Sequence, residues 1–83
     1  MNTQIKFIWD FRGPNAEKTA EHHEVHLKDF LKMNAMENHI TGVEQVNEFH
    51  HLAFLVLHES EMKTLRDRLK PHRGQVYNEA PQP

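Results

Sequence analysis

The residues of this chain best suited to chemistry are its histidines, eight in 83 residues with no cysteine. Histidine binds transition metals, transfers protons and changes charge near neutral pH. Spacing narrows the candidates to His22 and His26, four residues apart, and to the adjacent residues His50 and His51. The remaining histidines are predicted at the edge of the core, in loops or at strand ends: His23, His39, His58 and His72.

The spacing of His22 and His26 is typical of two metal ligands on one helix. Residues i and i+4 are neighbours on a helix surface, so the two rings can converge on one divalent transition-metal ion. Zinc needs one or two further ligands, which Asp10, His50 or His51 could supply, and His50 is the predicted third one. The segment is not a zinc-protease motif, because His23 and His26 are one residue too close. The alternative is that these are surface histidines that bind no metal.

Asp10 is the carboxylate predicted to act with a histidine. It lies near the end of the first apolar segment, and loops after strand ends often carry function. A carboxylate beside an imidazole forms an acid–base dyad, and His26 is the predicted catalytic partner. The structural alternative pairs Asp10 with Arg12 on one strand face and buries Trp9 in the core.

Positive charge is concentrated near the C-terminal end. Residues 63–73 contain five Lys or Arg and one acid, whereas residues 34–62 contain five acids and no Lys or Arg. The turn at residues 70–74, Lys-Pro-His-Arg-Gly, offers cations and backbone N–H groups to a small anionic ligand. Alternatively, these cations only stabilise a helix C-terminus. The residues predicted to bind a ligand are Trp9, Arg12, His51, His72 and Arg73.

Six elements must position these side chains. Strand patterns occupy residues 4–11, 40–46, 49–58 and 75–77, and helical periodicity occupies residues 16–33 and 59–70. The order βαββαβ predicts an α+β, ferredoxin-like fold, with a four-stranded antiparallel sheet and two helices on one face. Residues 1–77 are predicted to form a single domain and residues 78–83 a flexible tail. The core side of the first helix is predicted to include Ala20, His23, Leu27 and Leu31.

The second face of the sheet predicts a homodimer. The segment at residues 49–58 is apolar on both faces, and Ile8 adds to the face that the helices leave open. A second copy packed sheet to sheet would bury that surface. The net charge of −2 indicates no attraction to nucleic acid. The absence of a membrane-length apolar run or a signal-peptide pattern predicts a cytoplasmic protein away from membranes.

Residues 26–31, His-Leu-Lys-Asp-Phe-Leu, resemble the His-Leu-x-x-aromatic-Leu helix of small YCII-related proteins, which belong to the dimeric α+β-barrel group. In that family a helix histidine and an aspartate near the cleft are the catalytic candidates. The resemblance implies a catalytic role for His26. Where the family has Asp-Pro after the second helix, this chain has Pro71 and His72, so Asp10 would substitute by geometry.

Residues 51–56, His-Leu-Ala-Phe-Leu-Val, are similar to half of a vicinal-oxygen-chelate module. That family holds a divalent metal with strand-borne His and Glu ligands, and His51 is the residue that matches.

Three functions are thus predicted as alternatives. The first is a ligand-binding or regulatory homodimer with a histidine-lined cleft and no cofactor. The second is a cofactor-independent enzyme with His26 or His51 as general acid–base. The third is a transition-metal-binding domain.

Overall fold

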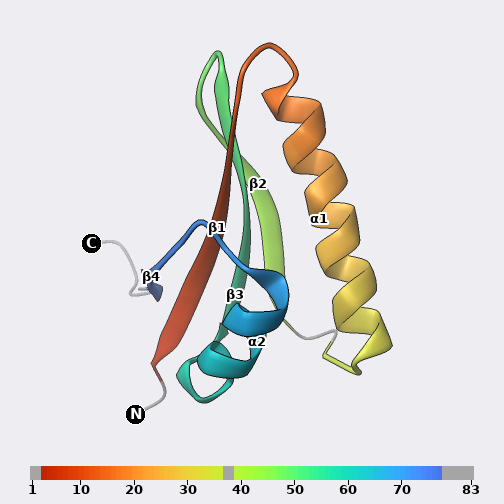
Figure 1. Cartoon of the computed structure of the whole chain (residues 1–83), viewed down its shortest axis with the longest axis vertical. Coiled ribbons are helices and arrows are strands. Elements are labelled where there is room, and N and C mark those ends of the chain that lie inside the picture. Colours follow the sequence, from red (N-terminus) through yellow and green to blue (C-terminus); the bar gives the residue numbers. More distant parts are fainter. Residues whose placement is uncertain (1–2, 37–38, 78–83) are drawn as a thin grey trace, which may run out of the picture.

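The computed structural model describes residues 3–36 and 39–77, which form one antiparallel sheet and two α-helices. The strand order β2-β3-β1-β4 is that of a ferredoxin-like arrangement, and it confirms the predicted α+β fold (Figure 1). Within these residues no helix is long and apolar enough to cross a membrane. The elements are β1 (Gln4–Arg12), α1 (Ala16–Met33), β2 (Ile40–Asn47), β3 (His50–His58), the 3₁₀ turn η1 (Glu59–Glu61), α2 (Met62–Leu69) and β4 (Arg73–Tyr77).

Two elements differ from the predicted bounds by more than one residue. The second helix begins with the 3₁₀ turn η1, where the Glu61 carboxylate accepts the backbone N–H of His58 at 3.0 Å and contacts His39 Nε2 at 2.9 Å. Strand β4 begins at Arg73, because Arg73 pairs with Ile8 of β1. The predicted tail at residues 78–83 lies outside the described residues.

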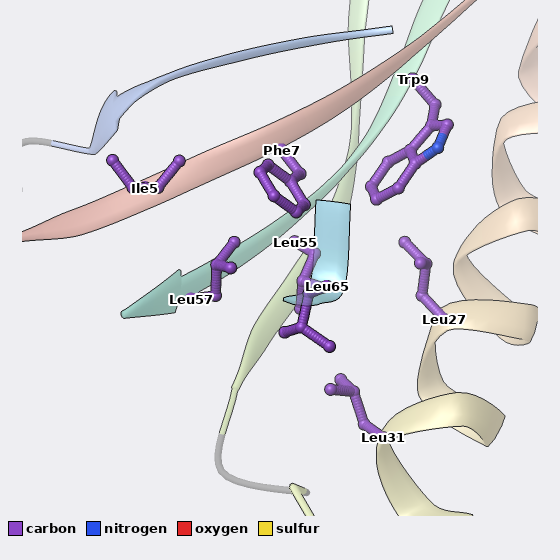
Figure 2. Packing of buried hydrophobic residues seen from close by; sticks show 8 residues of the cluster. All are labelled: Ile5, Phe7, Trp9, Leu27, Leu31, Leu55, Leu57 and Leu65. Carbon is purple, nitrogen blue, oxygen red and sulfur yellow. The ribbon is translucent and has the colours of Figure 1, made fainter. Parts of the chain in front are cut away.

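The core lies between both helices and one face of the sheet. Figure 2 shows side chains of β1 and β3 meeting those of α1 and α2. Alternation along β1 places every second residue on this face. The Trp9 indole Nε1 also donates a hydrogen bond to the carbonyl of Leu69, which ties β1 to the end of α2. The buried cluster comprises Ile5, Phe7, Trp9, Leu27, Leu31, Leu55, Leu57 and Leu65.

The second face of the sheet is the one that points away from the helices. Three of its apolar residues, Ile8, Leu52 and Val56, are at most 4% exposed in a single chain. On the same face the ring of Phe54 lies over Gly42, and Lys6 Nζ is 4.4 Å from the centre of that ring. The chain therefore buries these residues without a second copy. The homodimer stays a prediction.

Candidate functional site

Asp10 is the centre of a polar cluster on the second face of the sheet. Its Oδ1 lies 2.8 Å from His50 Nε2 and 3.1 Å from Arg73 Nη2, and its Oδ2 lies 2.9 Å from Arg73 Nε. The three residues come from β1, β3 and β4. An ionised carboxylate can only accept hydrogen bonds, so the proton of this pair is on His50 Nε2.

Arg73 sets the charge of this cluster. Its hydrogen bonds, together with the weaker effect of His50, outweigh the burial of Asp10 and lower the pKa of Asp10 from 3.8 to about 2. The same contact raises the pKa of Arg73. Asp10 is therefore ionised at neutral pH and orients the His50 ring rather than accepting a proton itself.

The predicted catalytic pair of His26 and Asp10 is not brought together. Asp10 follows Trp9, which points into the core, so its side chain is on the sheet face away from α1. His26 is exposed on α1. The predicted alternative, a pair between Asp10 and Arg12, is also replaced, because the partners of Asp10 are His50 and Arg73.

The predicted metal ligands lie on two separate surfaces, the exposed side of α1 and the second face of the sheet. His22 Nε2 and His26 Nε2 lie 3.0 Å apart on the exposed side of α1. His50, the predicted third ligand, is bonded to Asp10 on the far face of the sheet. Among residues 3–36 and 39–77, no three His, Cys, Asp or Glu side chains are grouped for a metal ion.

His23 lies at the edge of the core, as its helical position predicts. Its ring centre is 4.8 Å from that of Trp9 and 5.5 Å from that of Phe11. Its Nε2 is buried and has no hydrogen-bond partner among the described residues. Burial is the main cause that lowers the pKa of His23, and His26, His72 and His22 lower it further. The ring is therefore held neutral.

A groove of about 470 Å³ lies between α2 and β4, on the helix side of the sheet. Ile5, Phe7, Met62 and Val76 supply apolar surface, and Gly74 adds no side chain to fill the space. The polar groups in its lining that can donate hydrogen bonds include the cations Arg66 and Arg73 and the imidazole of His72. The sequence predicted a ligand-binding role for His72 and Arg73 but did not reveal the apolar surface, because that surface belongs to three elements, β1, α2 and β4, which only the fold places together.

His72 has a defined orientation in this groove. Its Nδ1 accepts the backbone N–H of Asp10 at 2.9 Å, and its own backbone N–H donates to the carbonyl of Ile8 at 3.0 Å. Because Nδ1 is an acceptor, a neutral His72 carries its proton on Nε2. The other predicted ligand-binding residues lie elsewhere: Trp9 and His51 are buried, and Arg12 is exposed at the end of β1.

Comparisons of the chain with protein-family models, curated proteins and solved structures found no match. The resemblances to YCII-related and vicinal-oxygen-chelate proteins rest on short motifs. The two histidines that match these families have different surroundings, since His26 is exposed on α1 and His51 is buried on β3. The function has to be argued from side-chain geometry.

Proposed function

We propose that this protein binds a small amphipathic carboxylate in the groove between α2 and β4. The observation that carries the proposal is the combination of an apolar surface and cationic side chains in one hollow of about 470 Å³. Small-molecule sites are commonly 300–1,000 Å³, mostly apolar, with a few polar groups that fix orientation. The apolar part of the ligand would contact Phe7 and Val76.

Arg66 and His72 are the residues that would hold the carboxylate. Arg73 is engaged by Asp10 through two hydrogen bonds, whereas the ion pair of Arg66 within the described part of the chain is a long contact of 3.9 Å to the exposed Asp67. Exposed pairs of this kind contribute little energy. A guanidinium binds a carboxylate through two parallel N–H groups, and His72 Nε2–H adds a third donor.

Titration with octanoate, followed by NMR chemical shifts, tests the proposal. Octanoate is expected to shift groove residues saturably, whereas acetate, which lacks the chain, and octanol, which lacks the charge, bind much more weakly. Arg66→Gln should weaken octanoate binding about tenfold, because a hydrogen bond to a charged group contributes about 1.5–3 kcal/mol.

The matched control is Arg68→Gln on the same helix. The Arg68 guanidinium lies 5.2 Å from the centre of the Phe30 ring and does not line the groove, so this change should leave octanoate binding unaltered. Equal loss in both variants would indicate general charge attraction. Absence of saturable shifts in the wild-type groove would contradict the proposal.

A second candidate function is proton transfer by His50, favoured by the 2.8 Å contact between His50 Nε2 and Asp10 Oδ1. A carboxylate that holds the proton on one ring nitrogen leaves the other nitrogen, here Nδ1, as the base. Nitrogen-15 NMR should find Nδ1 unprotonated in the neutral ring, and a mixture of tautomers in Asp10→Asn. A proton on Nδ1 in the wild-type protein would exclude this role.

A further inference from the structure

We propose that His22 and His26 chelate a divalent copper ion on the exposed face of α1. Their Nε2 atoms are 3.0 Å apart, and their rings are nearly perpendicular, with centres 4.6 Å apart. Because the two nitrogens already lie close together, little movement of the rings is needed for both to bind one metal ion. This site is separate from the groove between α2 and β4 and does not depend on the function proposed there.

The nitrogen separation is compatible with a copper ion. Bonds from histidine nitrogen to a metal ion are about 2.0–2.1 Å long, so nitrogens 3.0 Å apart enclose an angle of about 94° at the ion. A tetrahedral zinc site would need a separation of about 3.3 Å. An angle near 90° matches the tetragonal geometry of Cu²⁺ and Ni²⁺, and Cu²⁺ has the highest affinity of the divalent first-row ions.

The fold holds the two ligands in place. Helix α1 runs over 18 residues and is anchored on the sheet through Ala20, Leu27 and Leu31, which are buried. The backbone of the chelate is therefore fixed before metal binds. Neutral His22 and His26 share one hydrogen bond at this distance. For both Nε2 atoms to bind the ion, the donor ring would carry its proton on Nδ1 instead, so that each neutral ring offers an Nε2 lone pair.

Neighbouring side chains have other contacts. His23 packs against Trp9 and Phe11, and the Glu24 carboxylate contacts Thr41 at 3.1 Å and Lys28 at 3.6 Å. No third His, Cys, Asp or Glu joins the pair among residues 3–36 and 39–77. The remaining positions on the copper ion would be taken by water, so the site is an open two-histidine chelate rather than a closed structural centre.

Isothermal titration calorimetry with CuCl₂ on the untagged full chain tests the site. One Cu²⁺ per chain is expected, with a paramagnetic resonance spectrum of a tetragonal ion bound to two nitrogens. His22→Gln and His26→Gln should each weaken Cu²⁺ binding at least tenfold, and Zn²⁺ should bind the wild-type chain at least tenfold more weakly than Cu²⁺.

His58→Gln is the control, because it removes one exposed histidine from the chain and leaves the helix pair intact. Its Cu²⁺ affinity should stay within twofold of wild type. Circular dichroism checks that each variant is folded, which is expected since both helix positions are exposed. Equal loss in all three variants, or unchanged binding in His22→Gln and His26→Gln, would overturn the proposal.

The unfolding temperature gives a second measurement of copper binding to α1. The two nitrogens are held together only when α1 is folded, so a ligand that prefers the folded state raises the unfolding temperature. Cu²⁺ should therefore raise the unfolding temperature of the wild type and of His58→Gln, but not that of His22→Gln. A rise of equal size in all of them would place the copper elsewhere.

Discussion

At the scale of single residues, Asp10 contributes to the dependence of stability on pH. The pKa of Asp10 is lowered from 3.8 to about 2 by Arg73 first and His50 second. A carboxyl whose pKa is lower in the folded state stabilises the fold above the unfolded value, and this contribution is lost as the pH falls from about 5 to about 2. Each unit of pKa corresponds to about 1.4 kcal/mol, and because Arg73 is half exposed, solvent screening reduces the total to about 1–2 kcal/mol.

Urea unfolding of the wild type and Asp10→Asn between pH 2 and pH 7 measures this contribution. The free energies of unfolding should differ by about 1–2 kcal/mol at pH 7 and converge near pH 2. Glu44→Gln breaks the Lys6–Glu44 pair, in which the carboxylate side chain is 48% exposed, against 11% for Asp10, and it should change stability by less than about 1 kcal/mol. A gap for Asp10→Asn that does not depend on pH would contradict the assignment.

His23 lowers the stability of the fold, whereas Asp10 raises it. The reason is that the buried Nε2 of His23 has no hydrogen-bond partner among the described residues. Burying a polar atom without a partner costs about 1–3 kcal/mol. Replacing the ring with an apolar side chain, His23→Leu, should therefore raise the free energy of unfolding by about 1 kcal/mol, as measured by urea titration at pH 7. A loss of stability would show that the ring contacts with Trp9 and Phe11 outweigh the unpaired nitrogen.

At the scale of elements, local patterns were predicted well and long-range pairings were not. Helix α1 has the predicted bounds, and its buried residues include Ala20, Leu27 and Leu31, because helical periodicity is visible in the sequence. The His22–His26 contact follows from the same local spacing. The partners of Asp10, by contrast, lie 40 and 63 residues away and depend on strand register. The early start of β4 has the same cause, since its partner is β1.

Gly42 in strand β2 has a long-range contact that the sequence pattern does not predict. Gly42 pairs with Phe54 of β3, and a Cβ atom at Gly42 would overlap the Phe54 ring. Gly42→Ala should therefore lower the free energy of unfolding by about 1 kcal/mol, because the ring must move away from a well-packed position. In a Phe54→Ala background the same change should be neutral or stabilising, since glycine weakens a strand. Urea unfolding of the four proteins forms a double-mutant cycle, and additive effects would contradict the contact.

At the scale of the whole molecule, the two faces of the sheet carry different sites. The groove faces the helices and lies against β4, whereas the cluster of Asp10, His50 and Arg73 lies on the second face. On that second face Ile8, Leu52 and Val56 are buried within a single chain, Lys6 lies over the ring of Phe54, and ion pairs join Lys6 to Glu44 and Arg73 to Asp10. Permanent dimers usually bury more apolar surface than the second face of this sheet leaves exposed. Association through this face would therefore be weak.

If a homodimer forms through the second face, it should be a reversible equilibrium. Ile40, at the β2 edge of that face, is 43% exposed and is the apolar residue that a second copy would cover. Sedimentation velocity should then show a coefficient that rises with protein concentration in the wild type and stays constant in Ile40→Lys. A constant coefficient in the wild type would contradict the homodimer. Octanoate binding should be unaffected by that outcome, because the proposed contacts of octanoate, Phe7, Val76 and Arg66, lie on the opposite face and on α2.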